Sequence, residues 1–267
     1  MVEICVRGLK TKSIINWGEN VFDHFYEAIL ENQEMKIKNN DIIIITSKIV
    51  SMEQNAYKII NNVVPSKIAI DLGEKYNMDP KVVEVISEAC NGQILGGVEH
   101  ALLTKSKFGL SANAGVDLSN CPKGYILLLP NNPDKFADSF RKQINKKFNV
   151  DVAVLVIDSR TLPLKRGTSG VCLGLSGISP IVDERGNQDL YGKELIITTK
   201  AVADNLATMG NLVMGEADEQ MPFAIISGFN YKLTRYNEEA MKETMMPENE
   251  CLYFAPLIGG RGGKLDE

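Results

Sequence analysis

Carboxylates and short polar side chains recur in this sequence just beyond segments with strand or helix patterns. Asp117 stands in ANAGVDLSN with Asn120, Asp158 and Ser159 follow the apolar run VAVLVI, and Glu216 follows a helical segment. Oxygen ligands of this kind suit Mg²⁺ or Mn²⁺, which bridge the phosphates of a bound nucleotide. Taken alone, however, the segment around Asp117 is more typical of a tight turn between two strands. The spacing does not by itself bring the three acids together.

Basic residues stand in two loops that accompany these acids. Lys10 and Lys12 flank Thr11 near the N-terminus, and Lys165 precedes Arg166 after the apolar run. Carboxylates that converge without a cation repel one another, so a metal or basic groups must accompany any shared site. Two lysines on a surface turn are nevertheless ordinary, and the loop at Lys10–Lys12 alone favours exposure to solvent.

The hydrophobic pattern predicts an α+β protein with a mixed sheet in one large domain, residues 1–256, with room for two subdomains. Residues 257–267, rich in glycine, are expected to form a flexible tail. Strands are expected at 2–8, 41–46, 125–129, 152–157 and 222–229, and helices at 19–34, 66–76, 80–90, 133–147, 199–214 and 237–246.

Composition and motifs narrow the functional class. A net charge of -5 and a pI near 5.3 argue against nucleic acid as the main partner. No apolar run approaches the roughly 20 residues that span a bilayer, and the N-terminus lacks a signal-peptide core. Five scattered cysteines and two histidines without metal-binding spacing argue against zinc and disulfides and favour a reducing cytoplasm. No GxGxxG or Walker A motif is present.

Four glycines, Gly167, Gly170, Gly174 and Gly177, recur every three or four residues after the charged loop. Backbone without side chains can approach either a ligand or a packed element closely. The spacing leaves both interpretations open.

Five segments, in this order, together resemble the coenzyme F(420)-0:gamma-glutamyl ligase family: SKIVS, ANAGVDLSN, LLLPNNPDKFADSFR, DERGNQDLYGKEL and VADNLATMGNLVMGEADEQMP. The similarity extends from the first strand to about Gly228. It implies a nucleotide-dependent amide ligase, normally using GTP with Mg²⁺ or Mn²⁺, that joins L-glutamate to a carboxylate of a deazaflavin cofactor precursor. It also implies an unusual mixed α+β fold that forms an intertwined homodimer.

Matched position by position, the resemblance assigns roles to individual residues. Asp117 and Asp158 would be the catalytic residues and hold a first metal, while Ser159 and Glu216 would help to hold a second. The residues expected to contact the nucleotide are Leu9, Lys10, Thr11, Lys12, Ser47, Asn120, Met214, Gly215, Glu216, Ala217 and Asp218.

Two departures from the family pattern bear on the substrates. Met52 stands where the family usually has a lysine next to the nucleotide, so the nucleotide is expected to be GTP or ATP. The loop DSRTLPLKR after the apolar run is similar to bacterial relatives assigned to folate metabolism, so the acceptor is either a folate or a deazaflavin. Four basic residues could hold these anionic substrates: Arg160, Lys165, Arg166 and Arg185.

The expected reaction activates the acceptor carboxylate as an acyl phosphate, which the amine of glutamate then attacks. Two other readings stay open: a ligase that acts on another small carboxylate, and a nucleotide- or metabolite-binding protein without catalysis.

Overall fold

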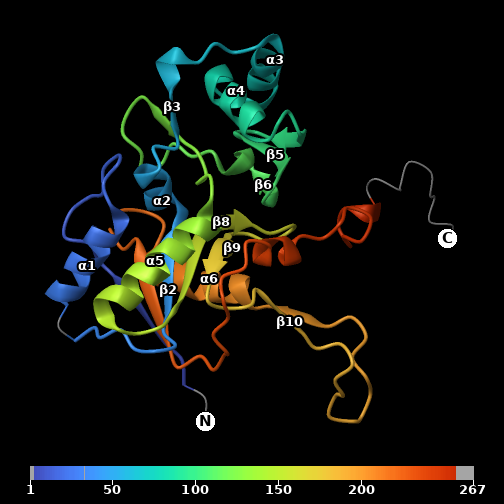
Figure 1. Ribbon diagram of the computed structural model, residues 1–267. Helices are drawn as coiled ribbons and strands as arrows, with labels where there is room; N and C mark the ends of the chain where they lie inside the picture. Colours follow the sequence, from blue (N-terminus) through green and yellow to red (C-terminus); the bar gives the residue numbers. More distant parts are fainter. Residues whose placement is uncertain (1–2, 33, 257–267) are drawn as a thin grey trace.

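The computed structural model describes residues 3–32 and 34–256, and its centre is a five-stranded mixed sheet (Figure 1). Only β2 and β8 run parallel; every other neighbouring pair is antiparallel. The carboxyl ends of β2 and β8 therefore meet at one edge of the sheet, where α/β proteins place their ligands. The strand order is β1 (Cys5–Leu9), β12 (Phe223–Ser227), β2 (Ile42–Thr46), β8 (Ala153–Thr161) and β9 (Thr168–Ser176).

Helices cover both faces of this sheet (Figure 1). The helices α1 (Val21–Glu31) and α5 (Pro133–Phe148) lie on one face and α6 (Val202–Met214) lies on the other. Along β2, Ile43 and Ile45 pack with α1 and α5, whereas Ile42 and Ile44 pack with α6. Because both faces are buried, the strand reads as an unbroken apolar run and not as an alternating one.

Two of the recurring glycines of β9 allow these helices to approach the sheet. A Cβ atom at Gly170 would overlap the backbone of Ala207 in α6, and one at Gly174 would overlap the backbone of Pro133 at the start of α5. At these two positions the glycine spacing serves helix packing and not a ligand.

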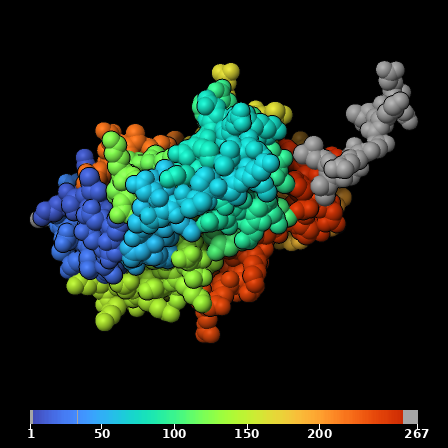
Figure 2. All heavy atoms as spheres, turned by 90° about the horizontal axis from the view of Figure 1, so that it is seen from above, coloured from blue at the N-terminus to red at the C-terminus, as the bar shows by residue number. Residues whose placement is uncertain are grey.

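A smaller unit with its own core caps the sheet, and Figure 2 shows it from above. Its helices are α3 (Lys67–Tyr76) and α4 (Pro80–Ala89), which pack on one another and on Leu102 and Ile126. Its remaining elements are β3 (Tyr57–Ile59), η1 (Ile60–Asn62), β4 (Ile94–Val98), β5 (Ala101–Ser106), β6 (Gly109–Ala112), η2 (Asn113–Gly115) and β7 (Tyr125–Leu127).

A long hairpin, residues 181–201, projects away from the body of the molecule (Figure 1). It begins with β10 (Ile181–Asp183) and ends with β11 (Thr199–Ala201), which pair antiparallel. The helix predicted from residue 199 therefore begins at Val202, because its first three residues belong to the hairpin.

One predicted helix is wrong and one short helix was not predicted. Residues 237–246 form only a short 3₁₀ turn, η3 (Ala240–Thr244), in which Ala240 alone is buried. Without an apolar face to pack, a helix of this length does not repay its nucleation cost. A short helix that we did not predict, α2 (Ser47–Glu53), follows β2 directly; seven residues are too few for a helical period to be recognised.

The predicted mixed α+β class is confirmed. The expected tail, 257–267, lies outside the described residues. Within the part that is described, every helix is too short or too polar to cross a membrane.

Candidate functional site

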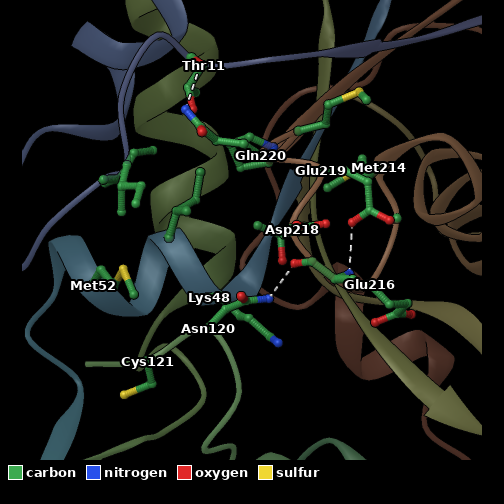
Figure 3. Close-up of a pocket in the computed structure, with 18 of the residues that line it drawn as sticks. Thr11, Lys48, Met52, Asn120, Cys121, Met214, Glu216, Asp218, Glu219 and Gln220 are labelled. Carbon is green, nitrogen blue, oxygen red and sulfur yellow. Dashed lines mark hydrogen bonds between the residues drawn. The ribbon is translucent and has the colours of Figure 1, made fainter. Parts of the chain in front are cut away.

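A cavity of about 600 Å³ opens beyond the carboxyl ends of β2 and β8 (Figure 3). Its walls come from five segments that are distant in the sequence: the loop after β1, the start of α2, the loop around Asn120, the end of β8 and the loop between α6 and β12. The parallel pairing that aligns Thr46 with Ile157 places Ser47 next to Asp158 at this edge.

Asp117 lies beside this cavity in an ion pair with Lys48. The Lys48 ammonium is 2.8 Å from Asp117 Oδ2 and donates to Ser119 Oγ at 2.8 Å. The Ser119 N–H donates to Asp117 Oδ1 at 2.7 Å. Burial acts to raise the pKa of Asp117, but these hydrogen bonds and the Lys48 charge outweigh it and hold the pKa below its ordinary value. The carboxylate is therefore ionised at neutral pH.

Asp158 occupies a different environment at the end of β8. Its Oδ1 accepts a hydrogen bond from Ser47 Oγ at 3.2 Å. Burial raises its pKa above the ordinary value, against the opposing effects of the Arg160 charge and the Ser159 N–H. A carboxylate whose ionisation is opposed by burial is stabilised by a cation beside it.

Glu216 brings another carboxylate to the cavity that Asp158 lines. Its two oxygens accept hydrogen bonds from Ser159 Oγ at 3.4 Å, Thr168 Oγ1 at 3.1 Å and Asn211 Nδ2 at 3.1 Å. The residue before it, Gly215, ends α6 with a φ of 78°, which aims the following loop back over the sheet edge.

The loop after α6 is tied to both neighbouring walls. Asn120 Nδ2 donates to Ala217 O at 2.9 Å, and Gln220 Nε2 donates to Thr11 O at 2.8 Å (Figure 3). The Thr11 N–H donates in turn to Gln220 O at 3.1 Å. Thr11, Asn120 and the loop that carries Glu216 thus form one continuous surface.

The other end of the cavity is apolar and aromatic. Trp17, the only tryptophan of the chain, packs against Tyr57 with ring centroids 4.6 Å apart, and its buried Nε1 has no partner among the described residues. Met52 lines this end and is buried. An apolar wall with one unpaired N–H is suited to a planar heterocycle.

The donors present fit a divalent cation by their chemistry. The side chains of Asp117, Asp158, Glu216 and Ser159 offer only oxygen, which Mg²⁺ and Mn²⁺ prefer. The Lys48 ammonium beside Asp117 shows that this position already attracts positive charge. As they stand, however, no three acidic, histidine or cysteine side chains of the described residues are grouped closely enough to hold a metal.

The structure brings together one part of the predicted site and separates another. Ser47 contacts Asp158 directly, whereas Leu9 is buried in the core beneath α1. The predicted residues that line the cavity are Thr11, Asn120, Asp158, Ser159, Met214, Gly215, Glu216, Ala217 and Asp218.

The predicted basic residues lie elsewhere. Lys12 is exposed and pairs with Glu31, and Lys10 is exposed next to it. Lys165 and Arg166 are exposed in the turn between β8 and β9. Arg185 lies on the projecting hairpin, where it pairs with Asp183 at 2.6 Å, and Arg160 points into a second cavity.

Sequence reasoning missed Trp17 and undervalued Lys48. The Ser47–Lys48 pair at a strand end was a signal, because ligands favour that edge, but only Ser47 was selected. Nothing in the sequence around Trp17 distinguishes a cavity wall from an ordinary core aromatic.

The sequence profile described as F420-0:Gamma-glutamyl ligase matches residues 8–228, most of the chain. The chain belongs to this family. It is similar to the Coenzyme F420:L-glutamate ligase of Methanocaldococcus jannaschii, with 42% identity over 73% of this chain and 78% of the relative. The corresponding protein of Methanopyrus kandleri is 38% identical over 80% of this chain and 84% of the relative. That of Methanothermobacter thermautotrophicus is 34% identical over 85% and 89%.

These matches confirm the family predicted from the five sequence segments, and with it a ligase that forms a C–N bond. The individual site residues stay predictions, which the geometry above now makes specific.

Proposed function

We propose that this ligase uses a nucleoside triphosphate to join L-glutamate to the coenzyme F420 precursor through an acyl phosphate. The observation that carries the proposal is the cavity itself, which joins an aromatic, apolar end to an acidic, oxygen-rich end at the edge where β2 and β8 stop. The relatives named Coenzyme F420:L-glutamate ligase supply the two substrates.

The two ends of the cavity give the nucleotide an orientation. Its base stacks in the apolar end beside Trp17 and Met52, and its phosphates extend toward Lys48 and Asn120. Both GTP and ATP carry a planar base that such a wall accepts.

Asp117 and Asp158 would hold a first Mg²⁺ or Mn²⁺, and Ser159 and Glu216 would help to hold a second. When bound, these ions supply positive charge to the phosphates, which carry the largest negative charge of the reaction. Lys48 adds a further cation at the same place, within 2.8 Å of Asp117.

The protein's own contribution is to position the reactants and exclude water. A carboxylate cannot acylate an amine in water at neutral pH, and its acyl phosphate hydrolyses unless it is shielded. The hydrogen bonds from Asn120 to Ala217 and from Gln220 to Thr11 fix the loop after α6 across the cavity, so this loop can shield the reacting groups.

A folate is the second acceptor to test, because the segment that begins at Asp158, DSRTLPLKR, is similar to relatives of folate metabolism. An intertwined homodimer belongs to the same proposal. Its structural support is the projecting hairpin, whose tip exposes Leu190 and Tyr191 almost completely.

The deciding experiment incubates the protein with Mg²⁺ or Mn²⁺, L-glutamate and GTP or ATP, and with the deazaflavin precursor or a reduced folate as acceptor. Phosphate release and the acceptor mass are followed together. We expect a glutamyl mass increment on the deazaflavin precursor. A glutamyl mass increment on the folate alone would show that the acceptor is a folate and not the deazaflavin precursor. Nucleotide binding without phosphate release or product would overturn the proposal in favour of a non-catalytic binder.

A further inference from the structure

A second cavity, of about 690 Å³, adjoins the last residues of β8. Its walls come from the β5–β6 turn, the start of α5, the middle of β9, Asp204 of α6 and the segment 236–254. Arg160 of β8 lines it. Asp158, which lines the first cavity, precedes Arg160 by two residues, a separation of about 7 Å along a strand.

The guanidinium of Arg160 is only partly satisfied. Its Nη1 donates to Phe108 O at 2.5 Å. Its Nε and Nη2 are both buried and have no hydrogen-bond partner among the described residues. Buried polar groups are nearly always paired, so two unpaired N–H groups on one side chain call for a ligand. Nε and Nη2 together form the edge of a guanidinium that binds a carboxylate through two parallel hydrogen bonds.

The acids around Arg160 do not fill this edge. Asp134 accepts from the Leu175 N–H and Asp204 accepts from the Cys172 N–H, each at 2.9 Å. Asp158 accepts from a serine of α2. Burial lowers the pKa of Arg160 and the charges of Asp158 and Asp204 oppose this, and an arginine keeps its proton throughout the neutral range.

A second unpaired donor faces the same cavity. Tyr236 lines it, and its buried hydroxyl has no partner among the described residues. Burial raises the pKa of Tyr236, so the phenol stays protonated and can donate. Lys107, also in the lining, donates to Asn131 O and adds positive charge at the cavity wall.

We propose that the second cavity binds a carboxylate-bearing substrate, whose carboxylate pairs with Nε and Nη2 of Arg160 and accepts from Tyr236. This inference rests on the proposed ligase function, which requires two carboxylate substrates next to the nucleotide. The shared chemistry is a carboxylate, supplied either by L-glutamate or by the acceptor. The position of Arg160 close to Asp158 places that substrate at the border between the two cavities.

The test compares Arg160→Lys, Arg160→Gln and Tyr236→Phe with the wild type. Lysine keeps the charge but lacks the two parallel donors. The matched control is Lys146→Gln, which removes one exposed charge at the end of α5. Steady-state kinetics gives KM for glutamate, acceptor and nucleotide separately, and calorimetry measures the binding of glutamate and of acceptor without turnover.

We expect both Arg160 variants to raise KM and Kd for one carboxylate substrate by roughly 10- to 100-fold, the loss of hydrogen bonds to a charged group. KM for the nucleotide should stay within about twofold of the wild-type value. Tyr236→Phe should weaken the binding of the same carboxylate substrate, but less than the Arg160 variants do. The substrate that is affected identifies the occupant: glutamate if only its KM rises, the acceptor if only that KM rises.

Three results separate failure of this inference from failure of the proposed function. Normal product formation with unchanged KM and Kd for both carboxylate substrates in Arg160→Gln would overturn the inference alone. An equal loss of affinity for the nucleotide and for both carboxylate substrates would also overturn the inference, because such a loss would indicate a structural defect. A wild type that forms no product but binds glutamate or acceptor through Arg160, as calorimetry would show, would overturn the function and keep the site.

Discussion

Asp158 lines the first cavity and Asp117 lies beside it, paired with Lys48, and their surroundings shift their pKa values in opposite directions. Asp117 is held ionised by the Lys48 ammonium and the Ser119 N–H, which outweigh its burial. Asp158 is dominated by burial, which raises its pKa. Paired carboxylates with divergent environments are typical of sites that handle charge. The proposed metal site would thus combine one carboxylate with a lowered pKa and one with a raised pKa.

Asp117→Asn keeps the shape of the side chain and removes its charge. We expect kcat/KM to fall by roughly 100-fold or more, because a preorganised charge next to the reacting phosphate is lost. Circular dichroism and the unfolding midpoint should show an intact fold, since Lys48 retains Ser119 as a partner. The exposed Asp71→Asn is the control. Full activity of Asp117→Asn at saturating Mg²⁺ would disprove the role of Asp117 in metal binding.

Asp158→Asn should stabilise the protein while removing its activity. The folded-state pKa of Asp158 is raised, so ionisation costs folding free energy above that pKa and costs nothing below the unfolded value of about 4. The unfolding free energy of the variant should therefore exceed that of the wild type by an amount that grows as the pH rises from the unfolded pKa to the folded pKa of Asp158. Each kcal/mol relieved raises the midpoint by about 2–4 °C in a domain of this size.

The measurement is thermal unfolding of Asp158→Asn and wild type at several pH values between 3 and 8, without metal, with Asp71→Asn as the control. A variant that is less stable at pH 7 than at pH 4, relative to the wild type, would contradict the assigned direction of the shift.

Individual site residues were accessible from the sequence only where residue type restricts their chemistry. Asp158 and Ser47 follow apolar strands, where ligands gather, whereas Asp117 and Glu216 stand in loops and were assigned by the family resemblance. The direction of Arg160 could not be predicted, because it depends on which cavity β8 and β9 leave open beside it. Arg185 was selected for its charge, but it lies on the projecting hairpin, where it pairs with Asp183.

At the scale of elements, strong periodicity or a buried apolar run predicted the long helices and the central strands. The helices α3 and α4 also carried local signals: Ser66 caps α3 by accepting from the Ala69 N–H, and Asp79 caps α4 by accepting from the Lys81 N–H. The short α2 carried neither, and its helical form follows from the burial of Ile49 and Val50 against the core. Tertiary contacts decided this element, not propensity.

Gly170→Ala tests how closely α6 must approach β9. The new methyl group would overlap the backbone of Ala207, so the helix must shift, and we expect a loss of about 1–3 kcal/mol in unfolding free energy. Because Glu216 directly follows α6, activity should also fall. The exposed Ser139→Ala on α5 is the control, since it adds no atoms and does not touch α6. Unchanged stability and activity in Gly170→Ala would show that α6 does not depend on this close contact.

At the scale of the whole molecule, the pairing of the sheet was the part that the sequence could not supply. The neighbouring strands β1 and β12 come from opposite ends of the chain, with Cys5 opposite Ser227. Period and propensity specify that a strand exists, but its neighbours depend on contacts between distant segments. The position of Asp158 and Glu216 on one cavity follows from that pairing, so it too was outside what spacing could show.

The projecting hairpin is internally ordered but not covered by its own chain. Backbone hydrogen bonds hold it together, including Leu195 N–H to Asn187 O at 2.8 Å and Glu184 N–H to Thr198 O at 3.0 Å. Yet Leu190 and Tyr191 are exposed to 100% and 96%. An apolar tip on a preformed strand pair is costly in water and suits burial against a second copy of the chain.

A triple variant, Leu190→Ser, Tyr191→Ser and Ile197→Ser, should therefore abolish the dimer that we propose for the wild type. Each of these side chains contributes about 1.5–3 kcal/mol when buried, so losing three on each of two protomers removes most of the driving force of such an interface. The measurement is sedimentation velocity over a range of protein concentrations, with the exposed Gln188→Ser on the same hairpin as the control. The hydrogen bonds within the hairpin use backbone groups and the side chains of other residues, such as Asp189, which accepts from the Tyr191 and Lys193 N–H groups. The substitutions remove none of these groups, so the variant monomer should keep its fold. A wild type that sediments as a monomer at all concentrations, or a variant that stays dimeric, would show that the hairpin tip does not join two copies.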